Sequence, residues 1–448
     1  MHELKLENLG SQYFEDNQIT SLADYVKKVE ELYLTLEKEN KTNEENNANE
    51  KNDSEEDNVC REKNNRAKEL RNDGKRELYF RGQGKVKYRN TCPSLFRNEK
   101  YYANESNMIN DFIAKYPDLF KDCQNNVDRL ALMQHHQLPT RLLDLTTNAL
   151  VALYFAVEED DDKKENKTQN ENKDKGEKDG VVYVFNNFYN EELVDKALAA
   201  SFTFELDKLA VIPHGSSKDH KILKIKSAKR DSFSDQIEIE TSLARMKQTD
   251  SEDFITEVTK FYQQLSKHSK SDKEVWGKAY LDYLKALNKG IDYSSLSCDA
   301  GKLLHKYDNF NNAVPTIRLY HAIERDSGNF DHIINPVEMY LPKIVTPRII
   351  DQRIKNQQGL FMLVPFIFDD EGIGTESILT KTQRLINTLL YTRRDEHTGK
   401  DKAIVFTIPC CMKEQIRKEL SNIGISKSFI YTDATSYAQD IANSYSKN

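Results

Sequence analysis

Residues 134–156 read QHHQLPTRLLDLTTNALVALYFA, and this stretch sets the pattern of the core. Pro139 ends the preceding helical pattern, because its ring fixes φ and it has no backbone N–H. Residues 141–145 then predict a strand or an extended turn. Residues 149–157 are apolar on every face, which in a water-soluble chain predicts a fully buried helix. The polar residues 146–148 can each cap that helix, so the stretch predicts a strand that leads directly into a buried helix.

Other strand-like segments surround this stretch along the chain. They begin near residues 78, 181, 345, 360 and 403, are rich in β-branched and aromatic residues, and are bounded by Gly or Pro. Helical patterns lie at residues 107–120, 127–135 and 412–422. This mixture predicts an α+β fold with a central mixed or antiparallel sheet, helices packed around it, and a mostly helical insertion.

Two low-complexity tracts divide the chain. Residues 37–76 and 158–180 are dense in Asn, Lys, Glu and Asp, so neither can bury enough apolar surface to fold. We expect an N-terminal helical segment that packs on the core (1–36), followed by a linker (37–76). The first part of the core (77–186) contains a disordered insertion (158–180), and the second part of the core is 325–448. Between them lies a mainly helical insertion (187–324), which includes amphipathic pieces at 254–266 and 273–287.

Composition excludes several classes of function. The 73 acidic and 65 basic residues give a formal net charge of −8. The chain therefore lacks the excess of basic residues that proteins use to bind nucleic acids without regard to sequence. No apolar run has the length of a membrane span and no signal peptide is seen, so we expect a cytoplasmic protein with no membrane partner. The six cysteines form no C-x-x-C pair, which argues against a metal site and a disulfide scaffold.

Four blocks of sequence together resemble the FRG family, which is named for a Phe-Arg-Gly triplet. They are LYFRGQG at 78–84, PSLFR at 93–97, QHHQLPTRLLDLTTNALVALYFA at 134–156 and RIKNQQGLF at 353–361. The triplet itself is Phe80-Arg81-Gly82. The resemblance implies a bacterial protein and suggests use as a toxin or an antiviral-defence effector, but it implies no particular activity.

A second resemblance, limited to short motifs, is to ADP-ribosyltransferases of the Arg-Ser-Glu type. The triplet at 80–82 is similar to the aromatic-Arg-Gly of their first core strand, and LTTN at 145–148 is similar to the Ser-Thr-Ser before their helix. This resemblance implies NAD as the cofactor, because these enzymes break the bond between nicotinamide and ribose. The chain departs from the pattern at Gln357-Gln358-Gly359, where a Glu-x-Glu is expected, since neutral amides do not stabilise a developing cation as a carboxylate does.

Arg81 suits the phosphate-binding role that this resemblance implies. A guanidinium at a strand end can bind phosphate through two parallel hydrogen bonds, and Gly82 would let a ligand approach the backbone. The alternative is a structural ion pair with a core carboxylate such as Asp144. Thr146 and Thr147 stand where a buried helix offers free N–H groups to an anion, and ordinary capping of that helix is their alternative.

The remaining candidates adjoin the same motifs. Asp144 could supply the charge that the Gln pair lacks, although a tie to Arg141 around the turn is the favoured interpretation. Gln357 would hydrogen-bond the ribose of a bound nucleotide. His135 and its neighbour His136 diverge by about a hundred degrees on a helix, so they do not form a chelating pair, and a structural role is favoured over acid–base chemistry.

These arguments lead to a nucleotide-binding, ADP-ribosyltransferase-like pocket that acts on NAD and takes a nucleotide or protein target, with a regulatory partner protein as a further hypothesis. The competing class is a non-catalytic recognition module that binds a ligand or a partner protein. A carboxylate that faces Arg81 would favour the first. The candidate catalytic residues, which we expect to converge on one cleft, are Arg81, Asp144, Thr146, Thr147 and Gln357. The candidate cofactor contacts are Arg81, Gly82, Gln83, His135, Arg141 and Gln358.

Overall fold

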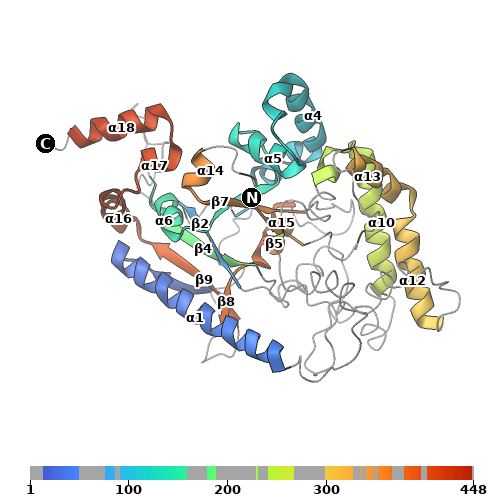
Figure 1. The fold of residues 1–448 in the computed structure, drawn as a ribbon, viewed down its shortest axis with the longest axis horizontal. Helices are drawn as coiled ribbons and strands as arrows, with labels where there is room; N and C mark the ends of the chain where they lie inside the picture. Colours follow the sequence, from blue (N-terminus) through green and yellow to red (C-terminus); the bar gives the residue numbers. More distant parts are fainter. Residues whose placement is uncertain are drawn as a thin grey trace, which may run out of the picture.

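The computed structural model describes residues 14–49, 76–85, 91–158, 179–187, 229–230, 241–266, 298–325, 334, 339, 341–346, 348, 352–365, 378–394 and 401–445. A sheet runs through the middle of the molecule, and helices lie around it (Figure 1).

Nine strands in the described part of the chain form one sheet. They are β1 (Phe14–Gln18), β2 (Leu78–Gln83), β3 (Leu142–Thr146), β4 (Gly180–Asn186), β5 (Lys229–Arg230), β6 (Lys343–Val345), β7 (Gly359–Leu363), β8 (Thr392–Arg394) and β9 (Asp401–Ile408). The order is β1-β9-β4-β2-β3-β7-β6-β5, and β8 pairs with β9. β1 runs parallel to β9 and β5 runs parallel to β6, whereas the other pairs are antiparallel. The α+β fold with a mixed sheet is therefore confirmed.

The helices are α1 (Leu22–Asn49), η4 (Ser94–Arg97), α3 (Glu99–Ala103), α4 (Glu105–Lys115), η5 (Pro117–Phe120), α5 (Asn126–His135), α6 (Ala149–Val157), α10 (Gln248–Ser266), α12 (Cys298–Asn311), α13 (Val314–Glu324), α14 (Gln352–Asn356), α15 (Ile378–Asn387), α16 (Cys410–Asn422), α17 (Lys427–Tyr431) and α18 (Ala434–Tyr445). None of these described helices combines the length and the apolar character that a membrane span requires.

Side chains of β2 and β4 alternate between the two faces of the sheet. Phe80 and Val182 lie in a cluster with apolar residues of α1, α6 and α16. Tyr79 and Tyr183 point the other way, into a second cluster with residues of η4 and α15. A third cluster joins α4 and α5 to β3, β6 and β7. The alternation follows from the two-residue period of a strand, and it fixes which face each candidate residue occupies.

α6 is the buried helix that the sequence predicts. Asn148 caps it, because its side-chain oxygen accepts hydrogen bonds from the N–H groups of Leu150 at 3.0 Å and Val151 at 3.4 Å. The hydroxyl of Tyr25 on α1 donates to the carbonyl of Ala149 at 2.9 Å. The start of α6 is thus fixed, which positions the residues that lead into it from β3.

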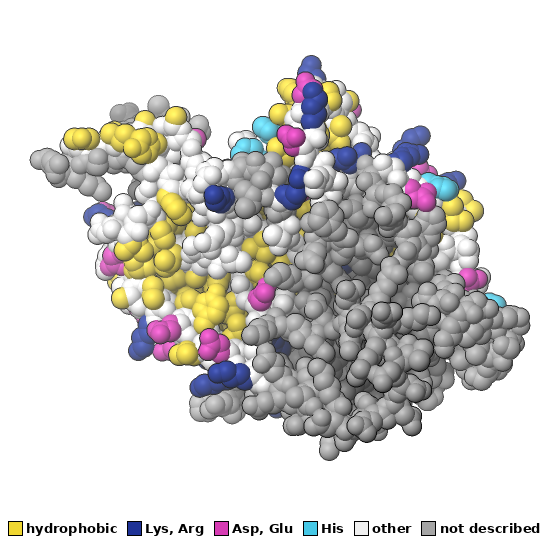
Figure 2. Space-filling model, viewed as in Figure 1, with side chains coloured by type: hydrophobic (Ala, Val, Ile, Leu, Met, Phe, Trp, Pro, Cys, Tyr) yellow, Lys and Arg dark blue, Asp and Glu magenta, His cyan; other side chains and the backbone are white. Residues whose placement is uncertain are grey.

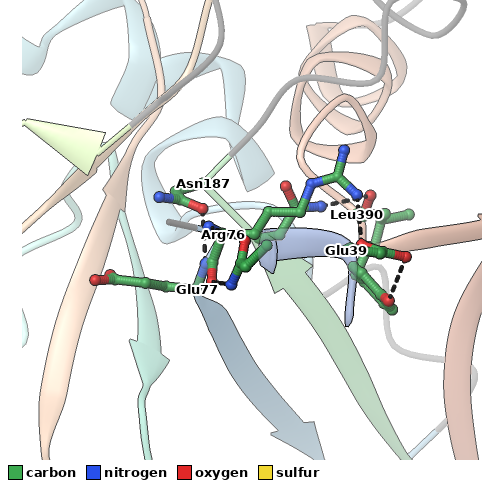
Figure 3. Close-up of polar contacts among 8 residues, drawn as sticks. Glu39, Arg76, Glu77, Asn187 and Leu390 are labelled. Atoms are coloured by element: carbon green, nitrogen blue, oxygen red, sulfur yellow. Dashed lines mark hydrogen bonds and ion pairs between the residues drawn. The ribbon is translucent and has the colours of Figure 1, made fainter. Parts of the chain in front are cut away.

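α1 continues to Asn49, past the boundary expected at residue 36. Polar contacts to the start of β2 hold this extension in place (Figure 3). Glu39 pairs with the Arg76 guanidinium at 2.8 Å, and the Asn40 side chain bonds the Arg76 backbone through its Oδ1 at 2.9 Å. Next to them, the N–H of Glu77 donates to Asn187 at 2.9 Å. A polar tract can extend a helix when its residues find partners elsewhere, as Glu39 and Asn40 do here.

The described part of the 187–324 segment is mainly helical, and α10, α12 and α13 lie together at one side of the molecule (Figure 1). The ring of Phe261 on α10 packs at an angle against those of Tyr307 and Phe310, with centroids 5.0 and 5.8 Å away. The same segment also contributes β5 to the sheet. The amphipathic piece expected at 273–287 lies outside the described residues.

Candidate functional site

Arg81 on β2 contacts Asp144 on the neighbouring strand β3. Its Nη1 donates a hydrogen bond of 2.7 Å to the Asp144 carbonyl and lies 3.8 Å from the carboxylate oxygen Oδ2. β2 and β3 pair at one position, where Phe80 lies opposite Thr146. Past this position the Asp144 carbonyl accepts its hydrogen bond from the Arg81 side chain. The Arg81 side chain is 14% exposed and that of Asp144 is 67% exposed. A solvent-accessible carboxylate therefore adjoins Arg81.

A chain of hydrogen bonds holds Asp144 and joins the motif blocks. Gln134 Nε2 donates to Asp144 Oδ1 at 2.7 Å, and Gln134 Oε1 accepts from the Thr140 hydroxyl. The Thr140 N–H donates to Ser94 Oγ at 3.3 Å, and the Thr140 carbonyl accepts from the N–H of Leu95 at 3.3 Å. The end of α5, the start of β3 and η4 are thereby tied together around Asp144.

η4 brings a second guanidinium to this region, which the sequence reasoning missed. Arg97 Nε and Nη2 donate to the Cys92 carbonyl at 3.1 and 2.9 Å. Burial lowers the pKa of Arg81, the negative charge of Asp144 raises it, and the positive charge of Arg97 lowers it. Arg97 is the last residue of the PSLFR block, and its place in that motif is the signal that could have identified it as a candidate site residue.

Gln83 lies two residues beyond Arg81 on β2, so both side chains leave the strand on the same face. Gln83 is 5% exposed, and within the described part of the chain neither its Oε1 nor its Nε2 has a hydrogen-bond partner. Buried amides are normally hydrogen-bonded, so an unpartnered one calls for an explanation.

Thr146 and Thr147 contact the Gln pair that precedes β7. The Thr146 hydroxyl donates to the Gln357 carbonyl at 2.6 Å and accepts from the N–H of Asn148 at 2.9 Å. The Thr147 N–H donates to the Gln358 carbonyl at 3.2 Å, and its hydroxyl donates to Gln358 Oε1 at 3.3 Å. Gln358 has a φ of 46°, in the left-handed region. The threonines thus tie the β3–α6 turn to the turn before β7, and Asn148 is the residue that caps α6.

The amide of Gln357 already has a partner. Its Nε2 donates to the Ile430 carbonyl on α17 at 3.0 Å. Arg353, at the start of the same block, lies over the Tyr431 ring with its guanidinium carbon 5.0 Å from the ring centroid. These contacts anchor α17 against α14, so they give the Gln pair a structural role in addition to any contact with a ligand.

Arg141 does not pair with Asp144, so the expected tie between them is wrong. The Arg141 side chain is fully buried, with its Nε 2.8 Å from Glu105 Oε1 and its Nη2 on Glu105 Oε2. The partner lies on α4, because Arg141 points into the interior while Asp144 is exposed. This geometry gives Arg141 a structural ion pair rather than a position at the surface.

His135 and His136 are both exposed at the end of α5. Their rings meet edge to face with centroids 5.2 Å apart, and the His136 ring lies 6.1 Å from that of Phe112. His135 directly follows Gln134, which holds Asp144. Within the described residues, no group of three or more His, Cys, Asp or Glu is arranged to hold a metal ion.

Gly82 faces the backbone of α6, where a Cβ would collide with the carbonyl of Ala152. The role expected for Gly82, an opening for a ligand, is therefore taken by the helix. The glycine allows α6 to lie directly on the sheet.

Most of the candidate residues lie on or beside the adjacent strands β2, β3 and β7. The structure brings Arg81 to Asp144, and it brings Thr146 and Thr147 to the Gln pair. β3 carries both Asp144 and Thr146 and so links the two groups. Whether they line a single cleft stays a prediction.

Residues 76–165 match the FRG domain, and this segment contains β2, η4, β3 and α6. No curated protein and no solved structure matches the chain, so the resemblance to ADP-ribosyltransferases is without support. The family supported by the comparisons is the FRG domain family, over residues 76–165.

Proposed function

We propose that the Arg81 cluster binds a phosphorylated nucleotide, with NAD as the leading candidate. One observation supports this most directly: the exposed carboxylate of Asp144 lies 3.8 Å from the partly buried guanidinium of Arg81. A guanidinium supplies the donors that a phosphate requires, and a neighbouring carboxylate can accept hydrogen bonds from ribose hydroxyls. The pair therefore offers complementary contacts to the two polar parts of a nucleotide.

Asp144 is also the group that could act on the bound ligand. A carboxylate fixed beside the ribose stabilises the positive charge that develops when the bond to nicotinamide breaks. Gln134 holds Oδ1 of Asp144 at 2.7 Å, so the carboxylate is oriented before a ligand arrives. Asp144 thus takes the role that the Gln pair at 357–358 lacks, and the proposed reaction is transfer or hydrolytic release of ADP-ribose. Use as a toxin or antiviral-defence effector rests on the family resemblance alone.

Calorimetric titration of the full chain with NAD tests the binding proposal. Arg81→Ala should weaken binding by roughly tenfold to a hundredfold, because it removes a charge-assisted contact worth about 1.5 to 3 kcal/mol. Arg318→Ala is the matched control, since Arg318 lies on α13 and contacts Asp250 and Asp253. Absence of binding by the wild-type chain at high micromolar NAD would defeat the proposal, as would equal affinity in the folded Arg81→Ala variant.

A recognition module is the second candidate, and the surface of α18 favours it. Tyr437, Ile441 and Tyr445 recur every four residues on this helix and are 62%, 43% and 78% exposed. Apolar side chains are visible along this helix (Figure 2). An apolar stripe at helical spacing is the surface that binds a partner protein through one helix face. Under this candidate Arg81 serves only as the structural partner of Asp144.

A further inference from the structure

The Arg81 region holds two guanidinium groups, those of Arg81 and Arg97. Arg81 and Arg97 both act on this region, and Asp144 is the carboxylate that raises the pKa of each. Arg97 sits at the end of η4, whose residues Leu95 and Phe96 pack in the cluster on the Arg81 face of the sheet. Two neighbouring guanidinium groups repel each other, so an anion between them would lower the energy of both.

Gln83 provides the second, independent observation. Its amide is more than nine-tenths buried on the face of β2 that carries Arg81, and among the residues that the structure describes neither of its polar atoms has a partner. An apolar side chain of the same size would be more stable at such a position unless the amide meets a ligand. An amide also suits an anion site, because its NH₂ group donates without adding charge.

We propose that Arg97 and Gln83 complete the Arg81 site as a second phosphate subsite, so that the cluster takes ligands with a diphosphate in preference to a monophosphate. This inference rests on the proposed function of Arg81. In the complete site Arg81 and Arg97 each bind one phosphate group, and Gln83 Nε2 donates to an oxygen of the diphosphate. Nε and Nη2 of Arg97 contact the Cys92 carbonyl in the structure, so these contacts hold the side chain near its binding position.

The test compares ADP, AMP and adenosine as calorimetric probes of the full chain. Wild-type protein should bind ADP about tenfold or more tightly than AMP, since the second charged contact is lost with the second phosphate. Arg97→Gln should reduce ADP affinity about tenfold, leave AMP affinity nearly unchanged and so abolish the preference. Arg318→Gln, on α13, should change neither affinity.

Gln83→Leu separates a ligand contact from a structural one. If the amide serves only a ligand, this variant should keep or raise the melting temperature and still lose ADP affinity. Unchanged ADP affinity in both folded variants, together with a loss in Arg81→Ala, would overturn the second subsite and leave the proposed function standing. Equal ADP and AMP affinity in the wild type would also overturn it. If Arg81→Ala binds NAD and ADP like wild type, the proposed function itself fails.

Discussion

The carbonyl oxygen of Ala152 on α6 lies 1.7 Å from the point that a Cβ on Gly82 would occupy. Gly180, on the neighbouring strand β4, is in the same situation, because its Cβ would lie 2.0 Å from the Ala156 carbonyl. Ala152 and Ala156 are one helical turn apart, so α6 presents small residues to two glycines on adjacent strands. This close contact sets the distance between the helix and the sheet, and the triplet that contains Arg81 is built around it.

Gly82→Ala should therefore destabilise the protein strongly. The added methyl group meets backbone atoms of α6, which cannot rotate away, so we expect a loss of about 3 kcal/mol or more in the free energy of unfolding. Gly84→Ala is the matched control, because its Cβ would meet the nearest atom at 3.5 Å, an ordinary contact. Urea unfolding followed by circular dichroism measures both. Similar midpoints for the two variants would contradict this interpretation of the triplet.

The sequence predicted the core elements where local pattern determines structure. The apolar run at 149–157 forms the buried helix α6, and the strand-like segments at 78, 181, 360 and 403 lie in the sheet. The strand expected to begin at Val345 is β6, which instead ends at that residue. β1 was missed because its sequence, FEDNQ, has one apolar residue, and its place depends on pairing with β9. Edge strands of this kind are specified by the partner and not by their own periodicity.

The candidate site was harder to predict, because partners in it are distant in sequence. Asp144 was named as the alternative partner of Arg81, and the structure places the two in contact. The partner of Arg141 is Glu105, which carries no motif and lies 36 positions away. The role of Gly82 was missed for the same reason, since only the packed position of α6 reveals it.

Replacing only one member of the Arg141–Glu105 pair should destabilise the fold strongly, whereas replacing both members should change its stability little. Arg141→Met alone leaves the Glu105 carboxylate buried without its partner, and we expect a loss of about 3 to 5 kcal/mol. Arg141→Met combined with Glu105→Leu removes both charges, so the double variant should recover most of that stability. A double-mutant cycle by urea unfolding gives the coupling energy. Additive losses would show that the two side chains do not depend on each other.

Residues 160–178 should be replaceable by a short Gly-Ser linker. They lie outside the described residues. The chain on either side is packed close together, because Gly180 lies against the backbone of Ala156. Tyr431 donates to Glu158 at 2.5 Å, and the N–H of Cys410 donates to Asp179 at 2.8 Å, so these end residues must be kept. Because loop entropy changes slowly with length, we expect the melting temperature to stay within about 3 °C. A larger fall would mean that the replaced tract contributes to the folded state.

Stability should fall as the pH rises above about 9, the ordinary pKa of a cysteine thiol. Burial raises the pKa of Cys92 to about 12. The folded state therefore keeps the thiol protonated while the unfolded state ionises, so its contribution is complete below the ordinary pKa and is lost towards pH 12. Between pH 9 and pH 10 this amounts to about 1 kcal/mol. Cys92→Val should reduce the slope of unfolding free energy against pH, whereas an unchanged slope would assign it to other groups.

Binding and turnover should depend on different members of the Arg81–Asp144 pair. Arg81→Lys keeps a positive charge but loses the planar pair of donors, so it should recover only part of the NAD affinity lost in Arg81→Ala.

Asp144→Asn keeps the shape and the oxygen that accepts from Gln134, but removes the charge that would stabilise a developing cation. We expect NAD affinity to fall less than in Arg81→Ala, because only the ribose contact is weakened, and nicotinamide release to fall by roughly a hundredfold, as for loss of one stabilising group. Chromatographic measurement of nicotinamide over hours, with calorimetry on the same preparations, separates the two effects. Thr147→Ser is a mild control at the neighbouring turn, because it keeps the hydroxyl that bonds Gln358. Nicotinamide release by Asp144→Asn at the wild-type rate would remove Asp144 from the chemistry and leave the cluster as a binding site only.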